Sequence, residues 1–92
     1  MKQFRKPSEE NDKIFPNEYR KNAIIAFEVD GTIYILNEFY ENQKAVAYSL
    51  HSHTIWKDME TMERLIEYLL GRGYFVYQFD CQKEFLMWAI KV

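Results

Sequence analysis

The chain has 92 residues, a net charge of −2 and a single cysteine, and 48% of its residues are hydrophobic. This size and composition fit one globular domain. The small negative charge argues against a general nucleic-acid binder, whose affinity comes from neutralising phosphates. The lone Cys81 excludes an internal disulfide and a cysteine-cluster metal site, and it suits a reducing compartment.

The sequence carries no secretory or membrane signal. Its first residues lack the apolar segment of a signal peptide, and no apolar run approaches the roughly 18 residues of a membrane span. We therefore expect a cytoplasmic protein with no membrane partner. Aromatic residues make up 17% of the chain. Because the core of so small a domain is thin, several of these rings are expected at the surface or at an interface.

The strongest local signal is a β-hairpin centred on Asp30-Gly31. The flanking segments 23–29 and 32–39 are rich in β-branched and aromatic residues. An Asp-Gly pair between two such segments is typical of a type I′ turn, which needs positive φ at both central residues. A tight turn here predicts three facing pairs: Val29 with Thr32, Phe27 with Tyr34, and Ile25 with Leu36.

The first 21 residues are polar and contain Pro7 and Pro16. They predict an extended or partly disordered N-terminal arm, followed by a single α+β domain over residues 22–92. Ile14 and Phe15 are expected to anchor this arm. A short helical turn over Ser8–Lys13, capped by Ser8, is an open alternative.

After the hairpin, alternating apolar residues predict a third strand over Lys44–His51. Residues 51–57 are expected to connect this strand to a helix over about 58–71, with Asp58 as its N-cap and a glycine after its last turn. Tyr74–Asp80 predicts a fourth strand. We expect Phe85–Val92 to form a fifth strand, although a C-terminal helix from about Lys83 competes, because several of these residues favour helices.

The expected fold class is therefore α+β, with strand and helix order β-β-β-α-β-β and one helix packed on one face of a small antiparallel sheet. One helix covers only one face of such a sheet. We expect the other face to need a cover from the N-terminal arm, a second copy or a partner. Its apolar residues are Ile24, Ala26, Ile33 and Ile35.

Residues with metal-binding or catalytic chemistry do not form a recognised motif. His51 and His53 would share one face of a strand, with Asp58 as a third ligand, but no zinc-binding spacing accompanies them. The carboxylate pairs and Cys81 lack a partner motif, and there is no glycine-rich phosphate loop. We therefore expect no catalytic residue, no metal and no cofactor.

The composition favours a non-enzymatic protein-interaction module, because aromatic residues are enriched at interface hot spots. Small acidic proteins of this kind are encoded by mobile elements, including phages, as inhibitors or regulators of host proteins, some of which bind nucleic acid. A homodimer is a second expected use of the same surface. The alternative is a nucleic-acid-binding regulatory module that uses sheet aromatics and the basic arm. The candidate partner-binding residues are Phe15, Tyr34, Tyr40, Tyr48, Trp56, Tyr77 and Trp88.

Overall fold

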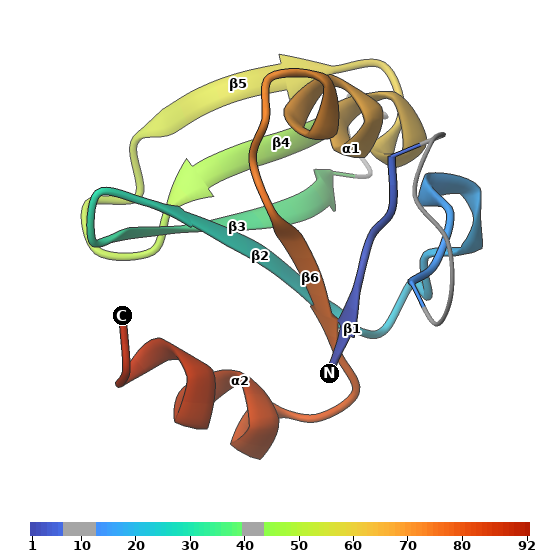
Figure 1. Ribbon diagram of the computed structural model, residues 1–92. Coiled ribbons are helices and arrows are strands. Elements are labelled where there is room, and N and C mark those ends of the chain that lie inside the picture. Colours follow the sequence, from blue (N-terminus) through green and yellow to red (C-terminus); the bar gives the residue numbers. More distant parts are fainter. Residues whose placement is uncertain (7–12, 40–43) are drawn as a thin grey trace.

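The computed structural model of the protein describes residues 1–6, 13–39 and 44–92 (Figure 1). Within them the chain forms an α+β domain with a six-stranded antiparallel sheet in the order β1-β6-β2-β3-β4-β5 and two α-helices. The strands are β1 (Lys2–Gln3), β2 (Ile24–Val29), β3 (Thr32–Phe39), β4 (Lys44–Ser49), β5 (Ile55–Met59) and β6 (Val76–Phe79). The helices are α1 (Met62–Gly71) and α2 (Gln82–Ala89), with a short 3₁₀ turn η1 (Pro16–Glu18).

The predicted hairpin is confirmed. Asp30 and Gly31 have φ values of 50° and 85°, as a type I′ turn requires. The strands β2 and β3 pair in the predicted register, Val29 opposite Thr32, Phe27 opposite Tyr34, and Ile25 opposite Leu36. The turn chemistry therefore determines which side chains of this hairpin share a face.

The helix α1 begins later than predicted. Its N-cap is Thr61, whose hydroxyl accepts a hydrogen bond from the Arg64 N–H at 3.1 Å. The predicted cap, Asp58, instead lies in β5, and this strand also includes residues 55–57 of the expected connection, whereas residues 51–54 do connect β4 to β5. Both Asp and Thr are favourable N-caps, so the sequence pattern alone did not separate them.

The C-terminal end of α1 depends on Gly73. This residue has a φ of 89°, and its N–H donates to the Leu70 carbonyl at 3.0 Å. The Tyr74 N–H donates to the Leu69 carbonyl at 3.1 Å. These two bonds form a Schellman motif, which satisfies carbonyls at the helix end and turns the chain towards β6.

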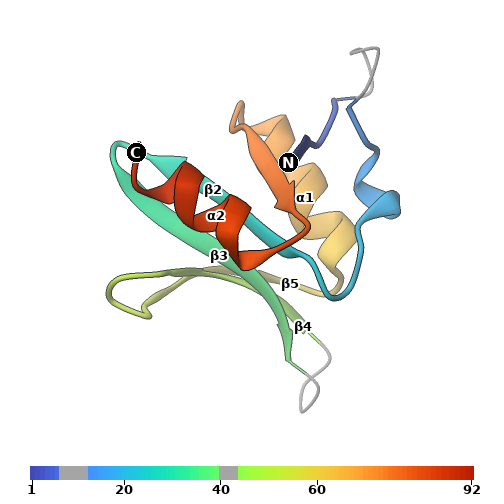
Figure 2. The ribbon, with the colours of Figure 1, turned by 90° about the horizontal axis from the view of Figure 1, so that it is seen from below.

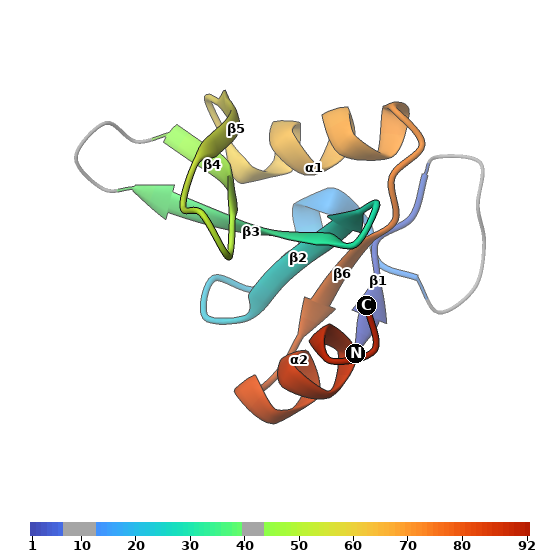
Figure 3. The same ribbon diagram turned by 90° about the vertical axis from the view of Figure 1, so that its left-hand side faces the viewer.

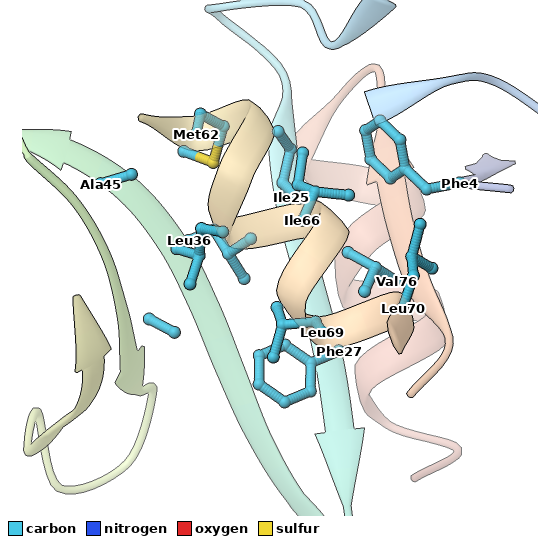
Figure 4. Packing of buried hydrophobic residues seen from close by; sticks show 12 residues of the cluster. Phe4, Ile25, Phe27, Leu36, Ala45, Met62, Ile66, Leu69, Leu70 and Val76 are labelled. Carbon is cyan, nitrogen blue, oxygen red and sulfur yellow. The ribbon is translucent and has the colours of Figure 1, made fainter. Parts of the chain in front are cut away.

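The main core lies between α1 and the sheet (Figure 4). The apolar side of α1 contributes five buried side chains, which pack on residues of β2, β3, β4 and β6. The helix side chains are Met62, Leu65, Ile66, Leu69 and Leu70.

The predicted fifth strand is wrong, because residues 82–89 form α2. The two helices lie on opposite sides of the sheet (Figure 3). Phe85 of α2 forms a second buried cluster with Ala26, Ile35 and Phe79. The face expected to need a cover from elsewhere is thus covered in part by the chain itself. In the view from below, α2 lies in front of the sheet (Figure 2).

The first residues of the chain extend the sheet. Lys2 and Gln3 pair with Gln78 and Tyr77 of β6, and Phe4 is fully buried in the main core. Ile14 also packs against this core. The proposed helical turn over 8–13 falls almost entirely outside the described residues.

Candidate functional site

Four aromatic rings gather on the α1 side of the sheet. Phe27, Tyr34, Trp56 and Tyr74 form this aromatic cluster, with ring centroids 5.1–5.9 Å apart in the contacting pairs. Trp56 is the extra residue of β5 at a bulge, because Ala47 and Tyr48 face Lys57 and Ile55. The bulge allows Trp56 to turn its ring towards the α1 side.

The aromatic cluster is mainly an extension of the core. Phe27 is fully buried, and Tyr34 and Tyr74 are half-buried. Only Trp56 is exposed, by 39%. The charged side chains of β5 interact with the rest of the domain. The Lys57 Nζ lies 4.6 Å from the Tyr68 ring centroid, and Asp58 forms an ion pair with Lys44 at 3.4 Å. Lysines and bulges on an edge strand discourage pairing with a further strand.

A second group of rings fixes α2 to the other face. Trp88 lies with its ring centroid 5.2 Å from that of Phe79 and 5.6 Å from that of Tyr77. Phe85 meets Phe79 edge-on at 5.6 Å. Two candidate partner-binding residues, Tyr77 and Trp88, are therefore in contact with each other and hold the helix on the sheet.

The opposite side of α2 is apolar and exposed. Leu86, Met87 and Ile90 have exposed fractions of 49%, 53% and 80%. On a helix the spacing i, i+1, i+4 places these side chains together, away from Phe85 and Trp88. We call this surface, formed by Leu86, Met87 and Ile90, the α2 face. It is the largest group of exposed apolar side chains on any helix of the described chain.

The other candidate residues are dispersed. Phe15 is exposed next to Arg5, whose guanidinium carbon lies 4.3 Å from the ring centroid. Tyr34 and Trp56 meet in the aromatic cluster, whereas Tyr48 lies on the opposite face, where its hydroxyl accepts a hydrogen bond from the Asn37 amide at 3.0 Å. Tyr40 lies outside the described residues.

The residues considered for metal binding or nucleophilic chemistry are also apart. His51 and His53 are exposed in the turn between β4 and β5, and Asp58 is paired with Lys44. The described residues contain no group of three or more His, Cys, Asp or Glu side chains placed to hold a metal ion. Cys81 is exposed at the N-cap of α2.

Among the described residues, two ionisable groups have shifted pKa values. The Tyr19 hydroxyl donates a hydrogen bond to Glu38, which, with partial burial, raises the pKa of Tyr19 to about 12. A hydrogen bond from Arg20 lowers the pKa of Asp80. Both pairs join the segment before β2 to strands of the sheet or their ends. The Tyr19–Glu38 pair lines a pocket together with Glu60 and Thr61, and Asp80 also lies near Lys2 and the amino group of Met1.

The α2 face was missed by the sequence prediction, because residues 85–92 were assigned to a strand. As a strand they place Leu86 and Trp88 on the same face. As a helix they place Phe85, Trp88 and Ala89 inward, and Leu86, Met87 and Ile90 outward. The signal that was present is the set of helix-favouring residues after Lys83.

Comparisons with protein-family models, curated proteins and solved structures found no match. Among the described residues, no helix has the length and apolar character needed to cross a membrane.

Proposed function

We propose that the protein is a non-enzymatic interaction module that docks on a protein partner through the α2 face. The observation that carries this proposal is the exposure of three large apolar side chains on one side of a helix whose other side is anchored by Phe85 and Trp88. Isolated exposed apolar residues are ordinary on small proteins, but contiguous ones are typical of interaction sites.

The chemistry of the α2 face favours docking over catalysis. Leu, Met and Ile side chains carry no titratable or nucleophilic group, and Met adapts well to irregular partner surfaces. Burying apolar area contributes roughly 25 cal/mol per Å² before the costs of association. The proposed effect on a partner is therefore steric, as expected of an inhibitor or regulator that occupies a host protein's surface.

The arrangement of the rings gives less support to the nucleic-acid alternative. Stacking of single-stranded bases needs rings in a row along a basic groove. Tyr34 lies on the α1 side of the sheet, whereas Tyr48, Tyr77 and Trp88 belong to the cluster on the α2 side. Tyr77 and Trp88 also pack against each other, 5.6 Å apart.

The proposal is tested with a matched pair of variants, Ile90→Gln and Ile55→Gln. Both isoleucines are exposed, by 80% and 61%, and Ile55 lies on β5, away from the α2 face. Each immobilised protein is incubated with host-cell extract, and retained proteins are identified by mass spectrometry. A partner retained by the wild type and Ile55→Gln, and lost with Ile90→Gln, is expected. Equal retention by all three proteins, or no retained partner, contradicts the proposal.

A further inference from the structure

Two lysines flank the α2 face. Lys83 precedes Leu86 and Met87 by about one helical turn, and Lys91 follows Ile90 directly. Both are exposed, and neither has an acidic side chain within ion-pair distance among the described residues. The apolar side chains therefore lie between two cationic groups.

The acidic residues near α2 are engaged elsewhere. Glu84 accepts from the Met1 amino group at 3.2 Å and from the Asp80 N–H at 3.3 Å. The Asp80 carboxylate forms an ion pair with Arg20 at 2.8 Å. Glu28 accepts from the Gly31 N–H at 2.8 Å, at the hairpin turn. Among the described residues neither Lys83 nor Lys91 is in an ion pair, although Glu28 lines the same pocket as Lys91 and the whole chain has a net charge of −2.

We propose that the α2 face receives an amphipathic helix of another protein, whose apolar stripe is flanked by Asp or Glu residues. This inference depends on the proposed function and names the chemistry of the partner. Acidic residues at the ends of the partner's stripe or beside it would face Lys83 and Lys91, and complementary charge sets orientation and raises the association rate. The apolar stripe would supply the buried contact at the centre.

The geometry of the surface favours a helix as the occupant. The side chains of α2 form a ridge about 12 Å long, which matches the grooves of a second helix. The backbone groups in the middle of a helix are bonded within it, so α2 offers an extended strand nothing to pair with.

A second copy of the chain fits this surface less well. A two-fold pair of α2 helices brings the same patch of each copy together. Lys83 and Lys91 of both copies would then meet at one interface, and the α2 face itself offers them no acidic side chain. An acidic partner removes this repulsion and a symmetric dimer does not.

The test is a selection from a display library of 16-residue amphipathic helices with a fixed leucine stripe and random flanking positions. Wild-type protein is the target, and Ile90→Gln removes peptides that bind elsewhere. We expect Asp and Glu to be enriched beside the stripe, and at least tenfold weaker binding of the selected peptides to Lys83→Glu/Lys91→Glu. Lys13→Glu/Lys21→Glu is the control with the same charge change, and its binding is expected to be unchanged.

The outcomes separate this inference from the proposed function. If the selected peptides carry basic residues or no charge preference beside the stripe, or if no peptide is selected, the inference of an acidic helix as the partner is wrong. If the partner retained from extract still depends on Ile90, the proposed function survives that result. Vesicles of phosphatidylglycerol form a second arm, because an anionic membrane offers similar chemistry. Sedimentation with vesicles that is lost in Lys83→Glu/Lys91→Glu, without selection of acidic helices, also overturns the inference.

Discussion

The two helices of this domain lie on opposite faces of one sheet, yet they use their apolar residues differently. The helix α1 buries Met62, Leu65, Ile66, Leu69 and Leu70 and keeps most of its polar residues outside. The helix α2 buries Phe85, leaves Trp88 half-buried, and exposes Leu86, Met87 and Ile90.

This difference shows which apolar residues the fold requires. Every large aliphatic side chain of α1 contributes to the main core, so α1 has little apolar surface left for a partner. In α2, one side attaches the helix to the sheet, and Leu86, Met87 and Ile90 on the other side belong to neither buried cluster. Apolar residues that the fold does not use are the ones available for binding.

The largest effect is expected from Leu69→Ala in α1. Leu69 is fully buried against the sheet, so its truncation should lower the free energy of unfolding by about 2–5 kcal/mol. The matched change Leu86→Ala in α2 should alter it by no more than about 0.5 kcal/mol. Urea denaturation of both variants measures the difference. Similar losses would show that α2 is packed as α1 is.

A smaller loss is expected from Trp88→Ala, which removes the ring that anchors α2. Trp88 is half-buried and contacts Tyr77, Phe79 and Phe85. We expect the free energy of unfolding to fall by about 1–3 kcal/mol. Near-ultraviolet circular dichroism should change, while the core beneath α1 stays intact. An unchanged unfolding curve would mean that α2 is not held by this ring.

The helix caps provide a third comparison, between Thr61→Ala and Cys81→Ala. The Thr61 hydroxyl caps α1, whereas the side chain of Cys81, at the N-cap of α2, makes no capping hydrogen bond. Loss of the Thr61 cap should destabilise the protein by about 1 kcal/mol. Thermal unfolding should show almost no change for Cys81→Ala. Equal shifts in the melting temperature would contradict this difference between the helices.

The smallest effect is expected from Tyr19, which packs against the main core and has its pKa raised to about 12 through Glu38. The unfolded tyrosine has a pKa of about 10. The folded protein therefore keeps a proton that the unfolded chain loses between these pH values. The contribution of this pair to the free energy of unfolding is therefore fully present below pH 10, and it decreases as the pH rises towards about 12.

We expect the contribution of the Tyr19–Glu38 pair to be below about 1 kcal/mol, since the pair is largely exposed to solvent. An absorbance titration of the tyrosines should show one late-ionising group that disappears in Tyr19→Phe. In Glu38→Gln, the pKa of Tyr19 should move back towards its ordinary value, because only burial and Glu63 then raise it. A late group that persists in both variants would assign the raised pKa to another tyrosine.

The sequence was most informative where local chemistry decides the structure. The Asp30-Gly31 turn determines the register of β2 and β3, because few residues adopt positive φ at both positions. The start of α1 was placed too early, since Asp58 and Thr61 are both suitable caps. Asp58 is excluded as the cap because it pairs with β4 as part of β5. This pairing depends on contacts between strands, which the local sequence does not show.

The α2 face shows a different limit of sequence-based prediction. Residues 85–92 contain strong helix formers and bulky apolar residues, so strand and helix were both plausible from the pattern. The outcome depends on the fit of Phe85 and Trp88 onto Phe79 and Tyr77 of β6. Once α2 is a helix, the exposed positions follow from its geometry, but the choice itself is a tertiary effect.

The most direct test of the docking surface is hydrogen exchange of the protein alone and bound to the partner retained from extract. We predict slower exchange in α2 on binding, with the amides of β5 unchanged. The variant Ile90→Gln should show neither the complex nor this protection, and its unfolding curve should match that of the wild type. Protection confined to β5 or to the aromatic cluster around Trp56 would contradict the assignment of the α2 face.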